Sequence, residues 1–169
     1  MNKVLGPAIC FIAICGCERS AEDVATLAYR DQFLSATEPA DPINLSEAAN
    51  LVKSGADGAE PRLVAVIGRI YAGELDPWEP NRASFILSEL PAEGHGEGHD
   101  ADNCPFCKRR AAKAPTAIVE FVDEKNETIP IDARKLFGID KGQTVIVRGK
   151  VSAGELGSLN LIADQMHVR

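Results

Sequence analysis

Two histidines and two cysteines fall within one short stretch of the chain. His95 and His99 are four residues apart, and Cys104 and Cys107 are three apart. Imidazole nitrogen and thiolate sulfur are ligands that zinc and copper favour, and four of them complete a tetrahedron. Glycines at positions 94, 96 and 98 let the backbone wrap so that both imidazoles can converge on one ion. The stretch therefore predicts a metal site with zinc or copper as the cofactor and these four side chains as its ligands.

Two other interpretations of the same cysteines remain open. The run from Cys104 to Cys107 reads Cys-Pro-Phe-Cys and resembles the active-site motif of thioredoxin-like proteins, which implies a thiol-disulfide oxidoreductase. The basic residues Lys108, Arg109 and Arg110 would lower the thiol pKa and favour thiolate. The context differs, because thioredoxin-like motifs lie between a strand and a long helix of an α/β sheet. In the remaining interpretation a disulfide or a zinc ion serves only to order the loop.

The first residues of the chain have the pattern of an export signal. Lys3 precedes an apolar run, residues 4–14, that is too short to span a bilayer as a mature helix. The run ends in Ile14-Cys15-Gly16-Cys17, which resembles the bacterial lipobox. This resemblance implies cleavage after Gly16, acylation of Cys17 and a membrane-anchored lipoprotein in the periplasm or cell envelope. An ordinary secretory signal and an uncleaved anchor are the alternatives. Only Cys104 and Cys107 would then remain as thiols, in an oxidising compartment.

Composition narrows the classes of function. The chain has 169 residues, a formal net charge of -7 and 45% hydrophobic residues, enough for a packed core. The acidic balance and the 5% aromatic content disfavour nucleic acid as a partner, because single-strand binders need a basic groove and stacking rings. We find no Ser/His/Asp grouping, no carboxylate pair in a recognisable context and no phosphate-binding glycine loop. We therefore expect a binding module rather than an enzyme, with the membrane and a metal ion as partners.

Short helices are expected ahead of the main domain. Val24, Leu27, Ala28 and Leu34 repeat at helical spacing, and the prolines near position 40 then break the pattern. A second helix is expected over residues 45–53, capped by Ser46 and ended by Gly55. We interpret residues 1–16 as the signal peptide and residues 17–60 as a tether.

From residue 61 the pattern becomes that of β-strands. A short helix capped by Asp132 and ended by Gly138 is expected between the third and fourth strands. Three strands, a helix and a two-stranded hairpin are the order of an OB-fold, a five-stranded Greek-key barrel. Residues 141–151 and 159–163 resemble its last two strands, and the chain also resembles uncharacterised bacterial OB-fold lipoproteins with a Cys-Pro-Phe-Cys loop, which implies no activity. We therefore expect a mainly β domain over residues 61–169 with a long loop at about 91–115; an SH3-like barrel is the alternative. The predicted strands are residues 63–71, 83–90, 116–123, 143–151 and a last one from 159.

Several other residues have weaker signals. Trp78, between the first two strands, is interpreted as a loop anchor, although OB-folds often bind ligands there. His167 is interpreted as a surface strand residue and not as a ligand, and Glu120 as a solvated residue. Arg69, Arg148 and Lys150 are interpreted as solvated charges on strand faces. Binding of nucleic acid or oligosaccharide on the barrel face is a further alternative that the fold permits.

Overall fold

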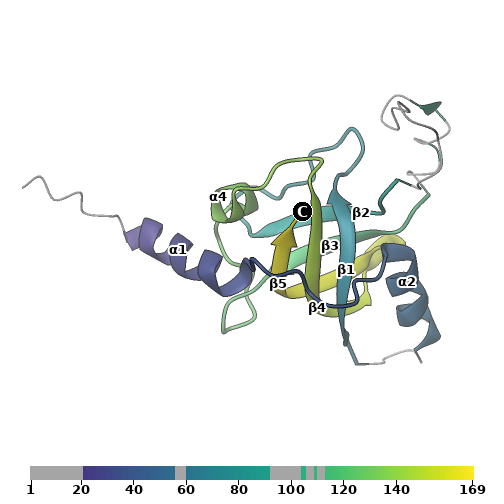
Figure 1. Ribbon diagram of the computed structural model, residues 1–169, viewed down its shortest axis with the longest axis horizontal. Coiled ribbons are helices and arrows are strands. Elements are labelled where there is room, and N and C mark those ends of the chain that lie inside the picture. Colours follow the sequence, from purple (N-terminus) through teal and green to yellow (C-terminus); the bar gives the residue numbers. More distant parts are fainter. Residues whose placement is uncertain (1–20, 56–59, 92–103, 106–108, 110–112) are drawn as a thin grey trace, which may run out of the picture.

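The chain folds as a mainly β protein built on one closed barrel (Figure 1). The structure is a computed structural model, and it describes residues 21–55, 60–91, 104–105, 109 and 113–169. Within these residues no helix is both long and apolar enough to cross a membrane. The elements, in chain order, are α1 (Ala21–Phe33), α2 (Leu45–Ser54), β1 (Arg62–Ile70), β2 (Ser84–Ser88), β3 (Thr116–Phe121), α4 (Ala133–Phe137), β4 (Thr144–Ala153), a 3-10 turn (Glu155–Gly157) and β5 (Leu159–Val168).

The order of the strands around the barrel is β1-β2-β3-β5-β4, and β4 closes the barrel by pairing with β1. Every pairing is antiparallel except that of β3 with β5, which is parallel. A five-stranded Greek-key barrel with one helix between the third and fourth strands is the OB-fold arrangement. The predicted fold class is therefore confirmed, and each predicted strand is present with ends shifted by a few residues.

Alternation along β4 places its valines inside the barrel, and Ile146 on the opposite face is also buried. Val145, Val147 and Val151 are buried in the core, whereas Arg148 and Lys150 between them are exposed. Gly149 faces a close approach of β5: a Cβ there would lie 2.2 Å from the carbonyl oxygen of Ile162. The register between β4 and β5 shifts at this point, between Arg148 and Gly149. The predicted phase of this strand is confirmed.

Helix α4 forms where the sequence predicts a helix. The side chain of its N-cap Asp132 accepts a hydrogen bond from the Arg134 amide at 2.9 Å, and Gly138 ends the helix with φ of 68°. A positive φ costs glycine little, which explains glycine at this position. Phe137 of α4 is buried against Phe121 of β3, with ring centroids 4.5 Å apart. The helix therefore contributes directly to the aromatic part of the core.

Helix α2 begins differently from the prediction. Its N-cap is Asn44, whose side-chain oxygen accepts a hydrogen bond from the Glu47 amide at 2.8 Å, while the Glu47 carboxylate accepts from the Asn44 amide at 3.3 Å. This is a reciprocal capping box, so the predicted capping role of Ser46 is wrong. Gly55 ends the helix as predicted.

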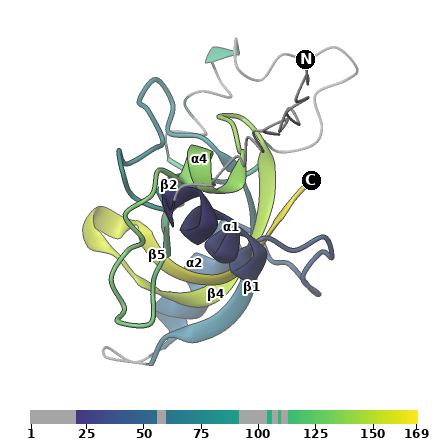
Figure 2. The same ribbon diagram turned by 90° about the vertical axis from the view of Figure 1, so that its left-hand side faces the viewer.

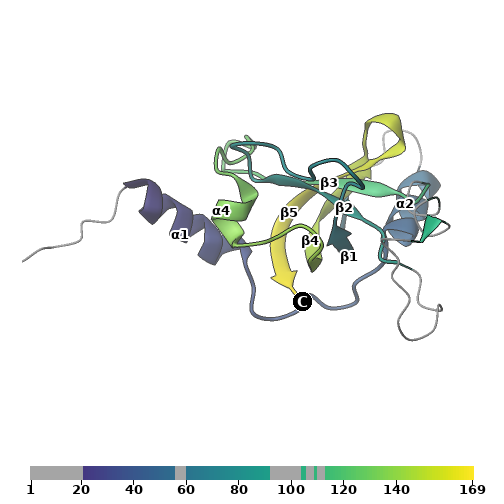
Figure 3. The same ribbon diagram turned by 90° about the horizontal axis from the view of Figure 1, so that it is seen from above.

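The segment between α1 and α2 crosses the outside of the barrel as a strap, residues 34–44 (Figure 1). At one end Leu34 forms a bridge to Met166 of β5, and at the other Ile43 forms a bridge to Val66 of β1. Beyond the strap Leu45 of α2 is fully buried in the core. Residues that the sequence analysis placed in a tether thus pack against the barrel from the end of α1 onward. Figure 3 shows α1 and α2 at opposite sides of the barrel.

Candidate functional site

The connection from β2 to β3 starts and ends on one pair of facing residues. Ser88 is the last residue of β2 and pairs with Thr116, the first residue of β3. On the next rung Leu87 pairs with Ala117, and both side chains are buried. The pairing of β2 with β3 is therefore complete without residues 89–115, which form a connection outside the sheet. All four predicted metal ligands belong to this connection.

Cys104 is the one predicted ligand that lies among the described residues. Its side chain is half-buried, and the next residue, Pro105, has helical backbone conformation, as does Arg109. Proline is favoured as the first residue of a helix, because it lacks the amide that such a position leaves unpaired. Cys104 therefore directly precedes a helical residue. Within the described residues no three His, Cys, Asp or Glu side chains come together as a metal-binding group.

The other predicted site residues lie outside the described residues. They are His95, His99 and Cys107 of the loop, and Cys17, the predicted site of lipidation. The chemistry of the four loop donors fits zinc or copper, because hard cations such as magnesium prefer oxygen ligands.

Glu89 connects the start of this loop to α2. Its carboxylate accepts hydrogen bonds from the Ser46 amide at 2.8 Å and from the Ser46 hydroxyl at 3.1 Å. A carboxylate near the first turn of a helix interacts favourably with the helix dipole. The loop therefore leaves β2 from a residue that is held against a helix of the core. Sequence reasoning missed Glu89, because its partner is 43 positions away in the chain.

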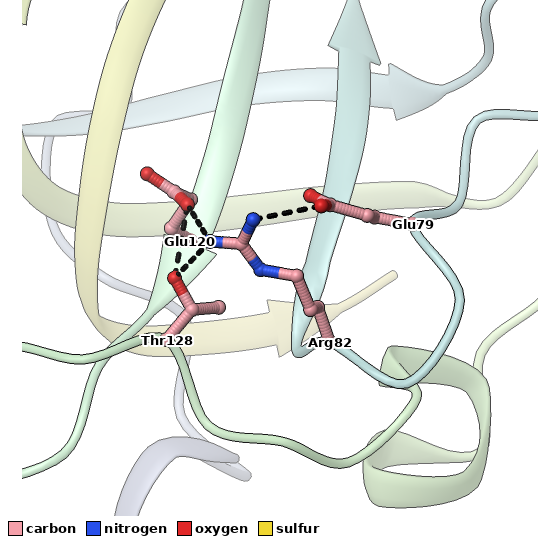
Figure 4. Close-up of polar contacts among 4 residues, drawn as sticks. All are labelled: Glu79, Arg82, Glu120 and Thr128. Atoms are coloured by element: carbon pink, nitrogen blue, oxygen red, sulfur yellow. Dashed lines mark hydrogen bonds and ion pairs between the residues drawn. The ribbon is translucent and has the colours of Figure 1, made fainter.

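A polar cluster on another part of the barrel centres on Arg82 (Figure 4). Its guanidinium donates to Glu79 at 2.7 Å, to Glu120 at 3.1 Å and to the Thr128 hydroxyl at 2.7 Å. The Thr128 hydroxyl in turn donates to Glu120 at 3.0 Å. These bonds join the β1–β2 connection, β3 and the segment that leads to α4. The interpretation of Glu120 as a solvated residue is wrong, because its half-buried carboxylate has two partners.

Trp78 lies next to this cluster in sequence and packs against the barrel. Its ring is edge-on to Phe85 of β2, with centroids 6.0 Å apart, and the Arg134 guanidinium lies 5.7 Å from its centroid. Arg134 also donates two hydrogen bonds to Asp132, at 2.9 and 2.6 Å. The hydrogen bond from Arg134 lowers the pKa of Asp132 below its ordinary value of 3.8. Because the aromatic face and the guanidinium are both engaged within the protein, we interpret Trp78 as a loop anchor.

The C-terminal residues hold the strap. His167 lies in β5 as the sequence predicts and is half-buried, and its Nδ1 lies 3.0 Å from the Ser35 carbonyl oxygen of the strap. Arg169 donates two hydrogen bonds to Glu38, at 3.1 and 2.7 Å. The hydrogen bond from Arg169 lowers the pKa of Glu38 below its ordinary value. These contacts attach the strap to the end of β5.

Two predicted surface charges on the strands also have partners. The Arg69 side chain donates to the Gly142 carbonyl oxygen at 3.1 Å and lies over the Tyr71 ring, so it braces the start of β4. Arg148 is exposed and forms an ion pair with Asp164 at 2.8 Å. The described outer face of β3 and β5 also exposes aliphatic side chains, Ile118 and Ile162.

Fold and topology together define the chain as an OB-fold protein. No family model and no curated protein sequence matches it. Among solved structures it is similar to the S. pombe Stn1-Ten1 complex, with 14% identity, coverage of 78% of this chain and 79% of that chain, and a TM-score of 0.41. It is also similar to a putative aspartyl-tRNA synthetase from Leishmania major Friedlin, with 13% identity, coverage of 88% of this chain but only 26% of that chain, and a TM-score of 0.41.

Proposed function

We propose that this chain is an exported OB-fold protein, anchored by lipid on Cys17, that binds a zinc or copper ion through His95, His99, Cys104 and Cys107. The observation that carries the proposal is the position of the β2–β3 connection. It leaves the barrel at a closed pair, Ser88 and Thr116, so its residues are not needed to complete the sheet. Long connections of this kind are usually functional or disordered.

The density of donors in this connection supports the metal. Two imidazoles and two thiols occur within thirteen residues of sequence, from His95 to Cys107. Cys104 is half-buried, so this residue is partly packed against other parts of the protein. When bound, zinc would hold the two halves of the connection together without redox chemistry, because Zn²⁺ has no accessible second oxidation state. The start of the connection is held in place by the hydrogen bond from the Ser46 amide to the Glu89 carboxylate.

The test is elemental analysis of the mature protein, extracted in detergent and purified without chelator, with a thiol count after denaturation. We expect about one zinc or copper ion per chain. We also expect two reactive thiols, those of Cys104 and Cys107, because the sulfur of Cys17 would carry the lipid. Protein that contains no metal and shows no reactive thiols would contradict the proposal. That result would indicate a disulfide between Cys104 and Cys107.

A second candidate function is thiol-disulfide exchange by Cys104 and Cys107. The observation that favours it is that Cys104 directly precedes a residue in helical conformation, Pro105. A helix N-terminus and nearby cations lower a thiol pKa and increase the thiolate fraction. In this function either Cys→Ala substitution abolishes insulin-disulfide reduction, whereas His95→Ala leaves it intact. In the metal-binding function the wild-type protein has no such activity.

A further inference from the structure

Helix α1 has one side that packs on the barrel and one that does not. On the packed side Phe33 is 4% exposed and stacks edge-on against Phe121, with ring centroids 5.2 Å apart. On the opposite side Val24 is 55% and Leu27 is 41% exposed. Ala28 is also exposed. Positions i, i+3 and i+4 of a helix lie on one face, so these three residues form a short apolar ridge.

Among the charged residues of α1, Asp23 borders the ridge, because it is exposed and lies four positions before Leu27. Glu22 points to the side of the helix that faces α4, where it forms an ion pair with Lys135. Asp31 lies on the ridge side only in the last turn, beyond Ala28. The apolar part of the ridge is therefore at the N-terminal end of the helix. Figure 1 shows that this end projects away from the barrel, and Figure 2 views the helix nearly along its axis.

The sequence places the proposed lipid close to this ridge. Cys17 precedes the first residue of α1, Ala21, by four positions. Four residues of extended chain span at most roughly 14 Å. An acylated Cys17 would therefore keep the first turn of α1 within that distance of the bilayer surface. A lipid surface is thus the nearest apolar partner for a ridge that nothing covers among the described residues.

We propose that the ridge of Val24, Leu27 and Ala28 lies on the lipid bilayer beside the acylated N-terminus. This inference rests on the lipid anchor of the proposed function. Amphipathic helices bind at the boundary between head groups and acyl chains, with their apolar face buried by ~5–10 Å. The ridge is short, so it assists the lipid anchor and does not replace it. Because α1 and α2 lie at opposite sides of the barrel (Figure 3), this orientation places α2, and with it Glu89 at the start of the β2–β3 connection, on the side away from the membrane.

The test is fluorescence quenching of a tryptophan placed on the ridge. Trp78 is the single native tryptophan, so the probes are introduced in a Trp78→Phe background, which keeps an aromatic ring against Phe85. The ridge variant is Val24→Trp, and the matched control is Leu156→Trp at the exposed tip of the β4–β5 connection. Full-length lipidated protein is reconstituted into phosphatidylethanolamine–phosphatidylglycerol vesicles, with and without acyl-chain-brominated lipid. Circular dichroism shows whether each variant keeps the fold.

We expect brominated lipid to quench most of the emission of Val24→Trp and to leave that of Leu156→Trp nearly unchanged. Equal quenching of the two probes in protein that carries an acyl label would overturn the ridge contact and leave the anchor standing. Emission from Val24→Trp that is blue-shifted but not quenched would also overturn it, because the ridge would then be covered by protein, for example by a second copy of this chain. Absence of the acyl label in the wild-type protein would overturn the anchor and the contact together.

Discussion

Gly149 is a position in β4 where a methyl group has no room, and Gly149→Ala is the sharpest test of the barrel. A Cβ at this residue would lie 2.2 Å from the Ile162 carbonyl oxygen and 2.9 Å from the Ala163 Cα, both of which are backbone atoms. Ordinary van der Waals contact between a Cβ and another heavy atom begins at 3.4 Å. The two strands would therefore have to separate by about 1 Å, which a packed core resists. The clash cannot be relieved by a rotamer change.

The expected cost follows from what the separation breaks. Overpacking a well-packed site costs about 1–3 kcal/mol. Loss of one hydrogen bond of the β4–β5 ladder adds about 1 kcal/mol. We therefore expect Gly149→Ala to lower the free energy of unfolding by about 2–4 kcal/mol, a large fraction of the roughly 5–15 kcal/mol that stabilises a domain. At about 2–4 °C per kcal/mol, the midpoint of thermal unfolding falls by roughly 4–16 °C.

The assay is urea and thermal unfolding followed by circular dichroism, with Lys150→Ala as the matched control. Lys150 is the next residue of β4 and is exposed. Its substitution should change stability by no more than about 0.5 kcal/mol. Equal stability of the two variants would refute the close approach of β4 and β5 at Gly149.

Three further predictions concern the core, the pH dependence and the anchor. Val147 is fully buried, so Val147→Asp should lower the free energy of unfolding by about 3–5 kcal/mol. Arg148→Ala, which removes only an exposed ion pair, should cost about 0–1 kcal/mol. Comparable urea midpoints for the two variants would mean that the phase of the strand is wrong. The Arg134 hydrogen bond lowers the folded-state pKa of Asp132 below 3.8, so the stability from this pair is present above that pH and is lost as the pH falls below it. Asp132→Asn should flatten the acid limb of the stability–pH curve, and an unchanged limb would contradict the contact. Cys17→Ser should abolish labelling by a radioactive fatty acid and release the protein from membranes; label that persists in this variant would exclude Cys17 as the acylated residue.

The strands and α4 could be predicted because their signals are local. Alternation of Val145 and Val147 with Arg148 gives the phase of β4, and the Asp132 and Gly138 caps mark both ends of α4. Such patterns depend only on the period of the element and on the chemistry of its ends. The order of the elements then selects the barrel.

Features that depend on residues distant in sequence could not be predicted. Ser46 is a good capping residue in isolation, but its amide and hydroxyl bind Glu89, and Asn44 caps α2 instead. Glu120 looks solvated on its strand, although Arg82 and Thr128 reach it from two other segments. The strap over the barrel was also missed, because its partners Val66, Met166 and His167 are distant from it in sequence.

The candidate site shows the same division. The donor residues and their spacing are evident from the sequence. The structure adds that the connection starts and ends at the paired residues Ser88 and Thr116. The attachment of the loop to α2 through Glu89 has no sequence signal, since carboxylates are common on loops and only the fold brings Ser46 to it.

Zinc titration against a chromophoric chelator, on the wild-type protein and five single variants, tests the central claim most directly. Loss of either histidine, in His95→Ala or His99→Ala, should weaken binding by leaving three ligands. Loss of Cys104 or Cys107 should weaken it further, because each breaks the chelating pair. Affinity should also fall as the pH is lowered, because protons compete for imidazole and thiolate. His167→Gln, which changes the one histidine outside the loop, should bind as the wild type does. Equal zinc affinity in the wild type and in both loop-histidine variants would contradict the four-ligand site.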